Sequence, residues 1–303
     1  MMDSFRSPLR YPGGKIKLAP LIKEILNDNP AIKNYVEPFA GGAGIAINLL
    51  LHHLVEHITL NDLDSAIFAF WKAVTEQSSD FLELFDSTEI SISEWKHQKE
   101  IFDSLDSSER LNDSQLLVFG FSTFYLNRTN FSGIIRGATP VGGMNQNGKW
   151  KIDYEFNKAR LRPLLIEIGK HSNHIDVVNY DMISGMSELS AVSDKYSPEE
   201  TLMFIDPPYV NQGRRLYLPI NSMTEHEKVA QQVKNLDCKW ILTYDEIPEL
   251  IDLYSFTANR YLYTLQYRVR THRLATEFIA GSENLNLQSS SVIQISREIS
   301  DKT

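Results

Sequence analysis

The stretch Asn-Tyr-Val-Glu-Pro-Phe-Ala-Gly-Gly-Ala-Gly at residues 34–44 joins a short apolar run to a glycine-rich turn. An apolar helical pattern follows over residues 45–54, so this part of the chain predicts a strand, a tight turn and a helix. Glycine suits such a turn because it has no Cβ and lets another group approach the backbone closely. In parallel α/β sheets a turn of this kind binds a nucleotide, and the alternative is a purely structural turn.

A second strand is expected directly after that helix. The residues Ile58, Thr59 and Leu60 lead into Asn-Asp-Leu-Asp at residues 61–64. Asp62 would then stand at the end of the second strand of a βαβ unit, where a carboxylate can accept hydrogen bonds from both ribose hydroxyls of a bound nucleotide. The other interpretation of Asp62 is a helix N-cap.

The remaining pattern predicts one sheet with a long interruption. Strand signals are scarce between residues 76 and 174, where amphipathic helices are expected at 80–85, 91–105, 113–126 and 155–171. Further strands are expected at 175–179, 201–205 and 239–244, followed by an antiparallel finish at 261–270, 276–280 and 291–296. We therefore predict an α/β fold whose sheet is interrupted by a largely helical insertion.

The composition is that of a water-soluble chain. Hydrophobic residues make up 42% and charged residues 23%, and no apolar run approaches the roughly 20 residues of a membrane span. The first residues lack the apolar core of a secretory signal, so we expect a cytoplasmic protein with no membrane partner. The lone Cys238 excludes a disulfide framework, and the histidines show no ligand spacing, so no metal is expected.

The net charge of −9 argues at first against a nucleic-acid partner, because phosphate-binding faces are normally basic. The basic residues are nevertheless clustered along the chain, whereas many acids lie between residues 80 and 113. The clusters contain Arg128 and Arg136; Lys149, Lys151, Lys158, Arg160 and Arg162; Arg214 and Arg215; and Arg268, Arg270, His272 and Arg273. Either a basic cleft on an acidic body or an ordinary solvated face would produce this pattern.

The tetrapeptide Asp206-Pro207-Pro208-Tyr209 follows an apolar strand pattern and should lie at the carboxyl end of a parallel strand, where open α/β sheets bind ligands. The two prolines supply no N–H donors and leave the Asp206 carboxylate and the Pro207 carbonyl as acceptors. Two such acceptors suit an aromatic amino group, and Tyr209 offers a ring on which a base can stack. A strand-terminating Pro-Pro turn is the plain alternative. The tetrapeptide is our predicted catalytic site.

The segment Arg-Tyr-Pro-Gly-Gly-Lys at residues 10–15 looks at first like a phosphate loop. A Walker loop needs a longer glycine spacing and Ser or Thr after the lysine, and Ile16 stands in that place. The alternative is a glycine turn that brings Tyr11 and Lys15 to a ligand.

Taken in order, the motifs RYPGGK at 10–15, EPFAGGAG at 37–44, NDLD at 61–64, LNRTNFSGIIRG at 126–137 and DPPY at 206–209 resemble those of the Dam-like, D12-class adenine-N6 DNA methyltransferases. The resemblance spans nearly the whole chain. It implies a Rossmann-like S-adenosylmethionine-dependent methyltransferase sheet, with a catalytic domain at 1–75 and 175–303 and an inserted target-recognition domain at 76–174. It also implies double-stranded DNA as the substrate, S-adenosyl-L-methionine as the cofactor and a possible cognate restriction endonuclease as a partner.

The resemblance also implies residue roles. The cofactor would contact Tyr11, Lys15, Glu37, Phe39, Gly41, Asp62, Tyr180, Asp181 and Asp206. The DNA would contact Arg128, Phe131, Ser132 and Arg136, with Arg128 on a phosphate and Arg136 on a guanine edge. For Arg136 a surface ion pair with a nearby acid is the alternative. Enzymes specific for GATC usually have Asn where Ser132 stands and an aromatic-Asn pair at residues 137–138, so the sequence departs from that branch.

Other activities fit the residues less well. Cytosine-N4 methylation would favour Ser, and protein glutamine methylation Asn, in place of Asp206. Cytosine-C5 methylation needs a nucleophilic cysteine, and Cys238 lacks the Pro-Cys context. A dehydrogenase would carry the full dinucleotide fingerprint. A catalytically silent DNA-binding module of the same fold is a further alternative. The expected function is adenine-N6 methylation.

Overall fold

The computed structural model describes residues 7–11, 15–106, 110–189, 195–208, 222–267, 273–283, 285, 287 and 294–299. The strands of this part form one eight-stranded sheet in the order β3-β2-β1-β4-β5-β7-β6-β8. They are β1 (Asn34–Glu37), β2 (His57–Asn61), β3 (Ile175–Val178), β4 (Thr201–Ile205), β5 (Lys239–Asp245), β6 (Arg260–Tyr267), β7 (Arg273–Gly281) and β8 (Gln294–Glu298). The strands from β3 to β5 are parallel, and β7, β6 and β8 complete the sheet in antiparallel pairs. The expected α/β fold with an antiparallel finish is confirmed.

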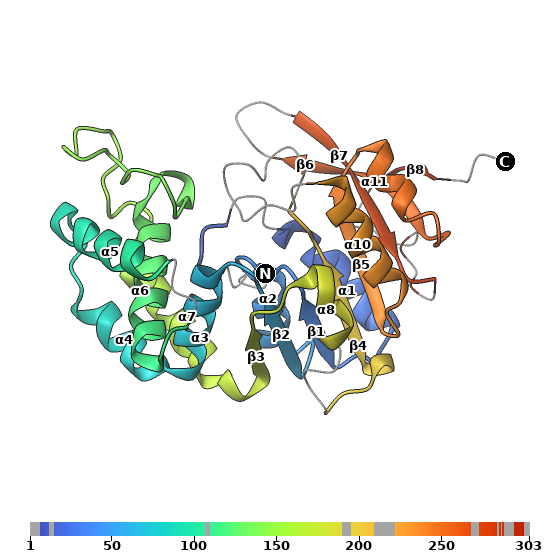
Figure 1. Cartoon of the computed structure of the whole chain (residues 1–303), viewed down its shortest axis with the longest axis horizontal. Coiled ribbons are helices and arrows are strands. Elements are labelled where there is room, and N and C mark those ends of the chain that lie inside the picture. Colours follow the sequence, from blue (N-terminus) through green and yellow to red (C-terminus); the bar gives the residue numbers. More distant parts are fainter. Residues whose placement is uncertain are drawn as a thin grey trace.

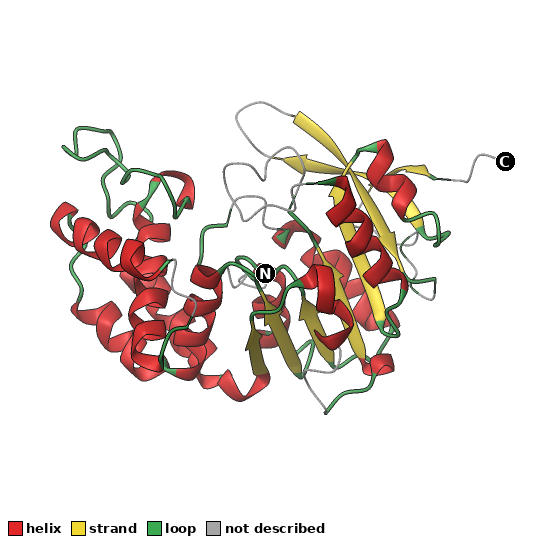
Figure 2. Ribbon diagram, viewed as in Figure 1, coloured by secondary structure: helices red, strands yellow, loops and turns green. Residues whose placement is uncertain are grey.

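Helices cover both faces of the sheet (Figures 1 and 2). One hydrophobic core contains residues of α1 (Ala19–Asp28), α2 (Gly44–Leu51) and α3 (Ser65–Glu76). A second core contains residues of α8 (Met182–Leu189), α10 (Met223–Lys234) and α11 (Pro248–Leu253). Tyr35 belongs to the first core and its neighbour Val36 to the second, because successive side chains of a strand point to opposite faces.

The chain between β2 and β3 forms a helical group beside the parallel end of the sheet, on the left of Figure 1. After α3 it contains α4 (Ser78–Ser87), α5 (Ile92–Leu105), α6 (Asp113–Thr129) and α7 (Lys158–Lys170). Short 3-10 turns occur at Ile16–Leu18, Phe131–Gly133, Ser172–His174 and Pro198–Glu200. Between β2 and β3 the described residues contribute only one isolated β-bridge, from Asn130 to Pro140. The sheet therefore has the largely helical insertion that the sequence predicts.

Capping side chains explain where these helices begin. The side chain of Asn112 accepts a hydrogen bond from the Gln115 backbone at 2.9 Å, and the Gln115 side chain accepts one from the Asn112 backbone at 3.0 Å, which starts α6. Helix α7 begins later than the expected residue 155, because Asn157 provides its N-cap by accepting from Arg160 N at 3.0 Å. None of the described helices combines the length and the apolar character needed to cross a membrane.

Aromatic packing joins the insertion to the sheet. Phe70 of α3 stacks on Phe124 of α6 with 5.7 Å between the ring centroids, and it meets Phe81 of α4 edge-on at 5.9 Å. All three side chains are fully buried. Helix α3 therefore packs against the helical insertion on one side and against the core of the sheet on the other. The insertion and the sheet share one hydrophobic core.

Candidate functional site

The site lies where the strand order reverses. From β1 the chain continues to β2 and β3 on one side, whereas β4 pairs with the other edge of β1 and continues to β5. The parallel strands all end at the same edge of the sheet, so the residues that follow β1, β2 and β4 are neighbours there. Open α/β sheets bind ligands at this kind of switch point. The predicted residues Glu37, Asp62 and Asp206 all stand at this edge.

The glycine loop after β1 is held from two sides. Gly41 N donates to Asp62 Oδ2 at 2.8 Å, and Gly41 O accepts from Trp71 Nε1 at 2.9 Å. Gly41 has a φ of +47°, and a Cβ at this position would lie 2.4 Å from Tyr11 Cε1. Glycine is therefore required both for the backbone conformation and for the contact with the Tyr11 ring. Tyr11 of the segment 10–15 thus contacts Gly41 of the segment 37–44.

Asp62 is partly buried at this edge of the sheet, and its carboxylate can still bind a ligand. Its Oδ1 accepts from Asp64 N at 2.9 Å, so each carboxylate oxygen already holds one backbone N–H and keeps further acceptor capacity. Burial, and secondly the charge of Asp64, raise the pKa of Asp62 to about 7. The N-cap of α3 is Asp64, whose Oδ1 accepts from Ala66 N at 2.9 Å. The alternative interpretation of Asp62 as that N-cap is therefore wrong.

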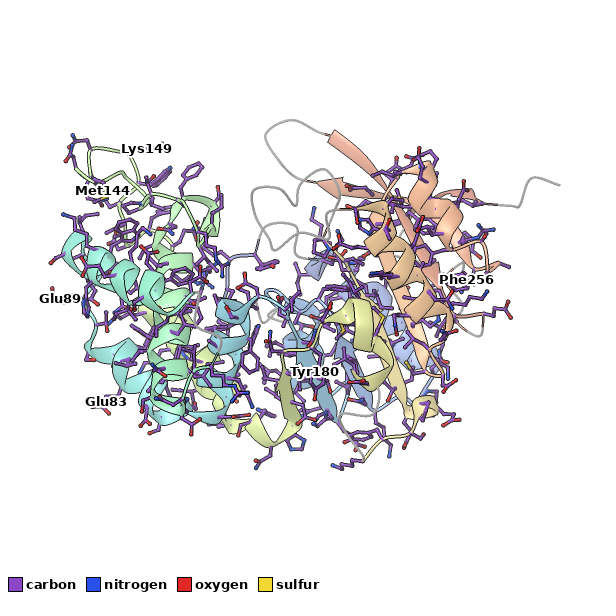
Figure 3. All side chains as sticks on the ribbon, viewed as in Figure 1. Glu83, Glu89, Met144, Lys149, Tyr180 and Phe256 are labelled. Atoms are coloured by element: carbon purple, nitrogen blue, oxygen red, sulfur yellow. The ribbon has the colours of Figure 1, made fainter. Side chains whose placement is uncertain are left out.

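Asn61 ties the ends of three strands together, a role that sequence reasoning missed. Its Nδ2 donates to Pro38 O at 2.8 Å and to Tyr180 O at 3.1 Å, and its Oδ1 accepts from Tyr180 N at 2.7 Å. Tyr180 is 42% exposed and stands beyond the end of β3 (Figure 3). Asp181 is also exposed and accepts from Ile183 N at 3.0 Å in the first turn of α8. The backbone at residue 180 is thus fixed while its ring is free to meet a ligand.

Glu37 is the last residue of β1 and lies at this edge of the sheet. Its side chain is buried, and Oε1 accepts from Ala46 N in α2 at 3.2 Å. Burial raises the pKa of the Glu37 carboxyl to about 8. Phe39 is half-buried and packs against the second core, so it connects the loop to the face that α8 covers.

Asp206 follows β4 and is half-buried. Its Oδ1 accepts from Thr243 Oγ1 of β5 at 2.8 Å and lies 3.6 Å from Lys15 Nζ. Lys15 is buried, and its ammonium also lies 3.4 Å from Glu277 Oε2 of β7. Burial raises the pKa of Asp206 to about 6, although Lys15 and the Thr243 hydroxyl oppose the shift. Lys15 therefore belongs beside the predicted catalytic carboxylate.

The rest of the tetrapeptide is only partly described. Pro207 is buried and Pro208 half-buried, whereas Tyr209 lies outside the described residues. Trp71, Asn61, Thr243 and Glu277 are site residues that the sequence did not reveal. Asn61 is only the first residue of the motif at 61–64, and the other three residues lie inside helix or strand patterns where no motif marks them.

Arg128 requires a correction. The prediction places it on a DNA phosphate, but its side chain is 3% exposed at the end of α6. Its Nε donates to Pro8 O at 2.6 Å and its Nη2 to Ser7 O at 3.1 Å. Burial lowers the pKa of its guanidinium to about 9. Arg128 thus holds the segment 7–11 against the insertion, and in this arrangement it does not face a phosphate.

The other predicted DNA contacts lie just beyond α6. Phe131 is 67% exposed, and Ser132 has a φ of 57°, so this turn presents side chains outward. Arg136 donates to both oxygens of Asp64, at 2.6 and 2.8 Å, and its Nε donates to Asp106 Oδ2 at 2.8 Å. The ion pair that was the alternative for Arg136 is therefore present in the unbound protein. A base contact would require these bonds to open.

The basic clusters are partly neutralised. Arg162 pairs with Asp86 at 2.8 Å, and Lys158 donates to the backbone carbonyl oxygens of Asp86 and Thr88. Arg162 and Lys158 therefore belong to a solvated face. Lys149 is exposed and lies on the loop above α5 and α6 (Figure 3). The members at residues 214, 215, 268, 270 and 272 and the side chain of Arg273 lie outside the described residues. Within the described residues, no three His, Cys, Asp or Glu side chains are grouped as metal ligands.

One family model and two curated proteins match parts of this chain. The family model of the D12 class N6 adenine-specific DNA methyltransferases matches residues 11–269. The Type II methyltransferase M.MjaIII of Methanocaldococcus jannaschii is 24% identical over 212 residues, which are 66% of this chain and 68% of that protein. A segment of 106 residues is 34% identical to mouse cilia- and flagella-associated protein 43, and it covers 34% of this chain and 6% of that protein.

Among solved structures, the rRNA methyltransferase aviRa from Streptomyces viridochromogenes superimposes with a TM-score of 0.39 at 10% identity, over 90% of this chain and 87% of that one. The family model spans residues 11–269, which include the glycine loop, Asp62 and Asp206 described above. The chain belongs to the D12 class of N6 adenine-specific DNA methyltransferases.

Proposed function

We propose that this adenine-N6 DNA methyltransferase binds S-adenosyl-L-methionine along the carboxyl edge of β1, β2 and β3 and presents the target amino group to it with Asp206 and Pro207. The observation that carries the proposal is the meeting of the glycine loop, Asp62 and Asp206 at the switch point of one sheet. A nucleoside held by the first two groups lies beside the third.

The residues at this edge fit the cofactor. The Tyr11 ring packs directly on Gly41, where a Cβ would clash with it, and Asp62 keeps acceptor capacity for the ribose hydroxyls. Tyr180 offers an exposed ring for the adenine, and Asp181 stands next to it. The proposed cofactor site is lined toward Asp206 by Lys15, Glu37 and Phe39. When bound, the cofactor supplies a methyl group on a positively charged sulfur.

Asp206 and Pro207 orient the nucleophile. The carboxylate and the Pro207 carbonyl accept the two hydrogens of the adenine amino group, which directs the nitrogen lone pair at the methyl carbon. The amino nitrogen would receive the methyl group, the cofactor sulfur would leave as a neutral thioether, and the extra proton on the nitrogen would pass to solvent. The work of the protein is positioning and electrostatic stabilisation, since the leaving group already carries a positive charge and no metal is needed to activate it.

The target base has to leave the duplex, because its amino group is otherwise paired and stacked. We assign residues 1–75 and 175–303 to the catalytic domain and 76–174 to target recognition, where Phe131, Ser132 and Arg136 occupy the exposed turn after α6. The flipped adenine stacks on Tyr209, and Pro208 restricts the turn that carries it. The matching relative is named a Type II methyltransferase, which supports a cognate restriction endonuclease as a partner. We also propose that the protein works in the cytoplasm.

The test compares two carboxylates. Asp206→Ala should abolish transfer of labelled methyl groups to unmethylated genomic DNA and leave DNA affinity nearly unchanged, because Asp206 serves the flipped base and no phosphate. Asp62→Ala should weaken cofactor binding, measured by calorimetry, with a smaller effect on the maximal rate. Near-normal turnover in Asp206→Ala would show that the catalytic assignment is wrong.

A further inference from the structure

Glu277 is a buried acid that none of the recognised motifs contains. It lies in β7, between Asp245 of β5 and Tyr263 of β6 in the sheet register, and it is 5% exposed. The family model ends at residue 269, so Glu277 also lies beyond the matched part of the chain. A buried carboxylate is costly unless it is paired and hydrogen-bonded, and its partners therefore indicate what it does.

Those partners lead directly to the catalytic carboxylate. Lys15 Nζ lies 3.4 Å from Glu277 Oε2 and 3.6 Å from Asp206 Oδ1, so one ammonium is shared between two acids. The Tyr263 hydroxyl donates to Glu277 Oε2 at 2.6 Å, and the Thr243 hydroxyl donates to Asp206 Oδ1 at 2.8 Å. Each acid thus has a hydroxyl that fixes it and a common cation between them.

We propose that Glu277 is a positioning residue for methyl transfer, which holds the Lys15 ammonium away from full pairing with Asp206 and so leaves the Asp206 carboxylate available to the target amino group. The inference rests on the proposed function of Asp206. A buried ammonium with a single carboxylate neighbour would pair with it closely, because the attraction is strong where water is excluded. A carboxylate engaged in that way is a poorer acceptor for a neutral amine.

The charges around Asp206 determine the sign of the expected pH effect. Several titratable or charged groups among the described residues act on Asp206 or on its partners. They are Lys15, Tyr35 and Glu37 of β1, Tyr244 and Asp245 of β5, Tyr263 of β6 and Glu277 of β7. The negative charge of Glu277 raises the pKa of Asp206, and the positive charge of Lys15 lowers it. Neutralising Glu277 removes the first effect and strengthens the second, so both changes lower the pKa of Asp206.

The decisive variant is Glu277→Gln, with the exposed Glu283→Gln as a matched control that removes the same charge just after β7. We expect Glu277→Gln to lower kcat about tenfold, the effect of roughly one hydrogen bond to a charged group, with unchanged affinities for S-adenosylmethionine and DNA. The acid limb of the pH profile of kcat/KM should move to lower pH. Carbon NMR of the ligand-free protein should show the same downward shift in the pKa of Asp206.

Further variants separate positioning from folding. Glu277→Asp keeps the negative charge, so the acid limb should stay closer to its wild-type position than in Glu277→Gln. If Glu277→Gln does not fold, Tyr263→Phe tests the same contact, because it removes only the hydroxyl that orients Glu277, and it should lower kcat without changing the cofactor affinity.

The proposal would be overturned if folded Glu277→Gln had a wild-type kcat and an unshifted acid limb. If Glu277→Gln fails to fold, the same result in folded Tyr263→Phe would overturn it. This failure is distinguishable from failure of the proposed function, because Asp206→Ala would still abolish transfer if only the role of Glu277 were wrong.

Discussion

At the scale of single residues, we expect the ionisation of Asp206 to set the acid limit of the reaction. The carboxylate accepts hydrogen bonds from the amino group only when it is deprotonated, and burial raises its pKa to about 6. Methyl transfer should therefore decrease as the pH falls through about 6 and level off above it. Single-turnover rates across the pH range, at saturating DNA and cofactor, measure this limb.

Thr243→Val provides the control for that assignment. The Thr243 hydroxyl stabilises the charged form of Asp206 and lowers its pKa, so its removal should move the acid limb to higher pH. The direction is opposite to that expected for Glu277→Gln. A limb that stays in place in Thr243→Val would mean that another group titrates.

Arg128 leads to a prediction about stability. Its replacement by Ala leaves the buried carbonyl oxygens of Ser7 and Pro8 without their donor, which should reduce the free energy of unfolding by about 1–3 kcal/mol. Urea denaturation measures that loss. The salt dependence of DNA binding should stay as in the wild type, whereas replacing the exposed Lys149 should flatten it if that residue meets a phosphate. A flatter slope in Arg128→Ala would instead restore its predicted phosphate contact.

At the scale of elements, the loop between β1 and α2 makes the sharpest demand on residue type. Gly41→Ala should greatly weaken cofactor binding, because the new Cβ meets the Tyr11 ring at 2.4 Å and the backbone has a φ of +47°. Gly143→Ala is the matched control, since its φ is +73° and a Cβ there meets nothing within 4 Å. Calorimetric titration with S-adenosylmethionine should show a loss only for Gly41→Ala. Equal losses would mean that backbone strain alone is responsible.

The elements themselves were largely predictable, because apolar periodicity reports which face of a strand or helix is buried. The strand order and the contacts between distant strands were not predictable in this way. Thr243 contacts Asp206 because β5 lies beside β4, and Glu277 contacts Lys15 from β7, which lies beside β5. A strand pattern does not reveal such neighbours. Arg128 shows the opposite difficulty. Its position in a motif indicated a ligand contact, whereas the fold of the N-terminal segment over α6 buries it.

At the scale of the whole molecule, Arg136 connects the insertion to the cofactor edge. Its guanidinium bridges Asp64, which caps α3, and Asp106, at the end of α5. If the bridge opens and Arg136 contacts a guanine edge, Arg136→Ala should relax the preference at one base position, at a cost of about 1–3 kcal/mol of discrimination. Methylation of a library with every base varied around the target adenine measures the preference.

Asp106→Asn is the companion variant. It weakens one side of the bridge and leaves the arginine in place, so base preference should be retained. Unchanged preference in Arg136→Ala, together with similar losses of stability in both variants, would assign Arg136 to the bridge alone.

The aromatic stack of Phe70, Phe81 and Phe124 limits how such enzymes can be recombined. A recognition segment cut out at residues 76 and 174 would take Phe81 and Phe124 with it and leave Phe70 facing water on α3. The grafted segment would carry an equally unmatched surface into its new host. Exchange of sequence specificity between relatives, in the laboratory or by gene conversion, should therefore succeed where α3 is exchanged together with the insertion. The segment that must be inherited as a unit is then larger than the domain proposed to contact the DNA.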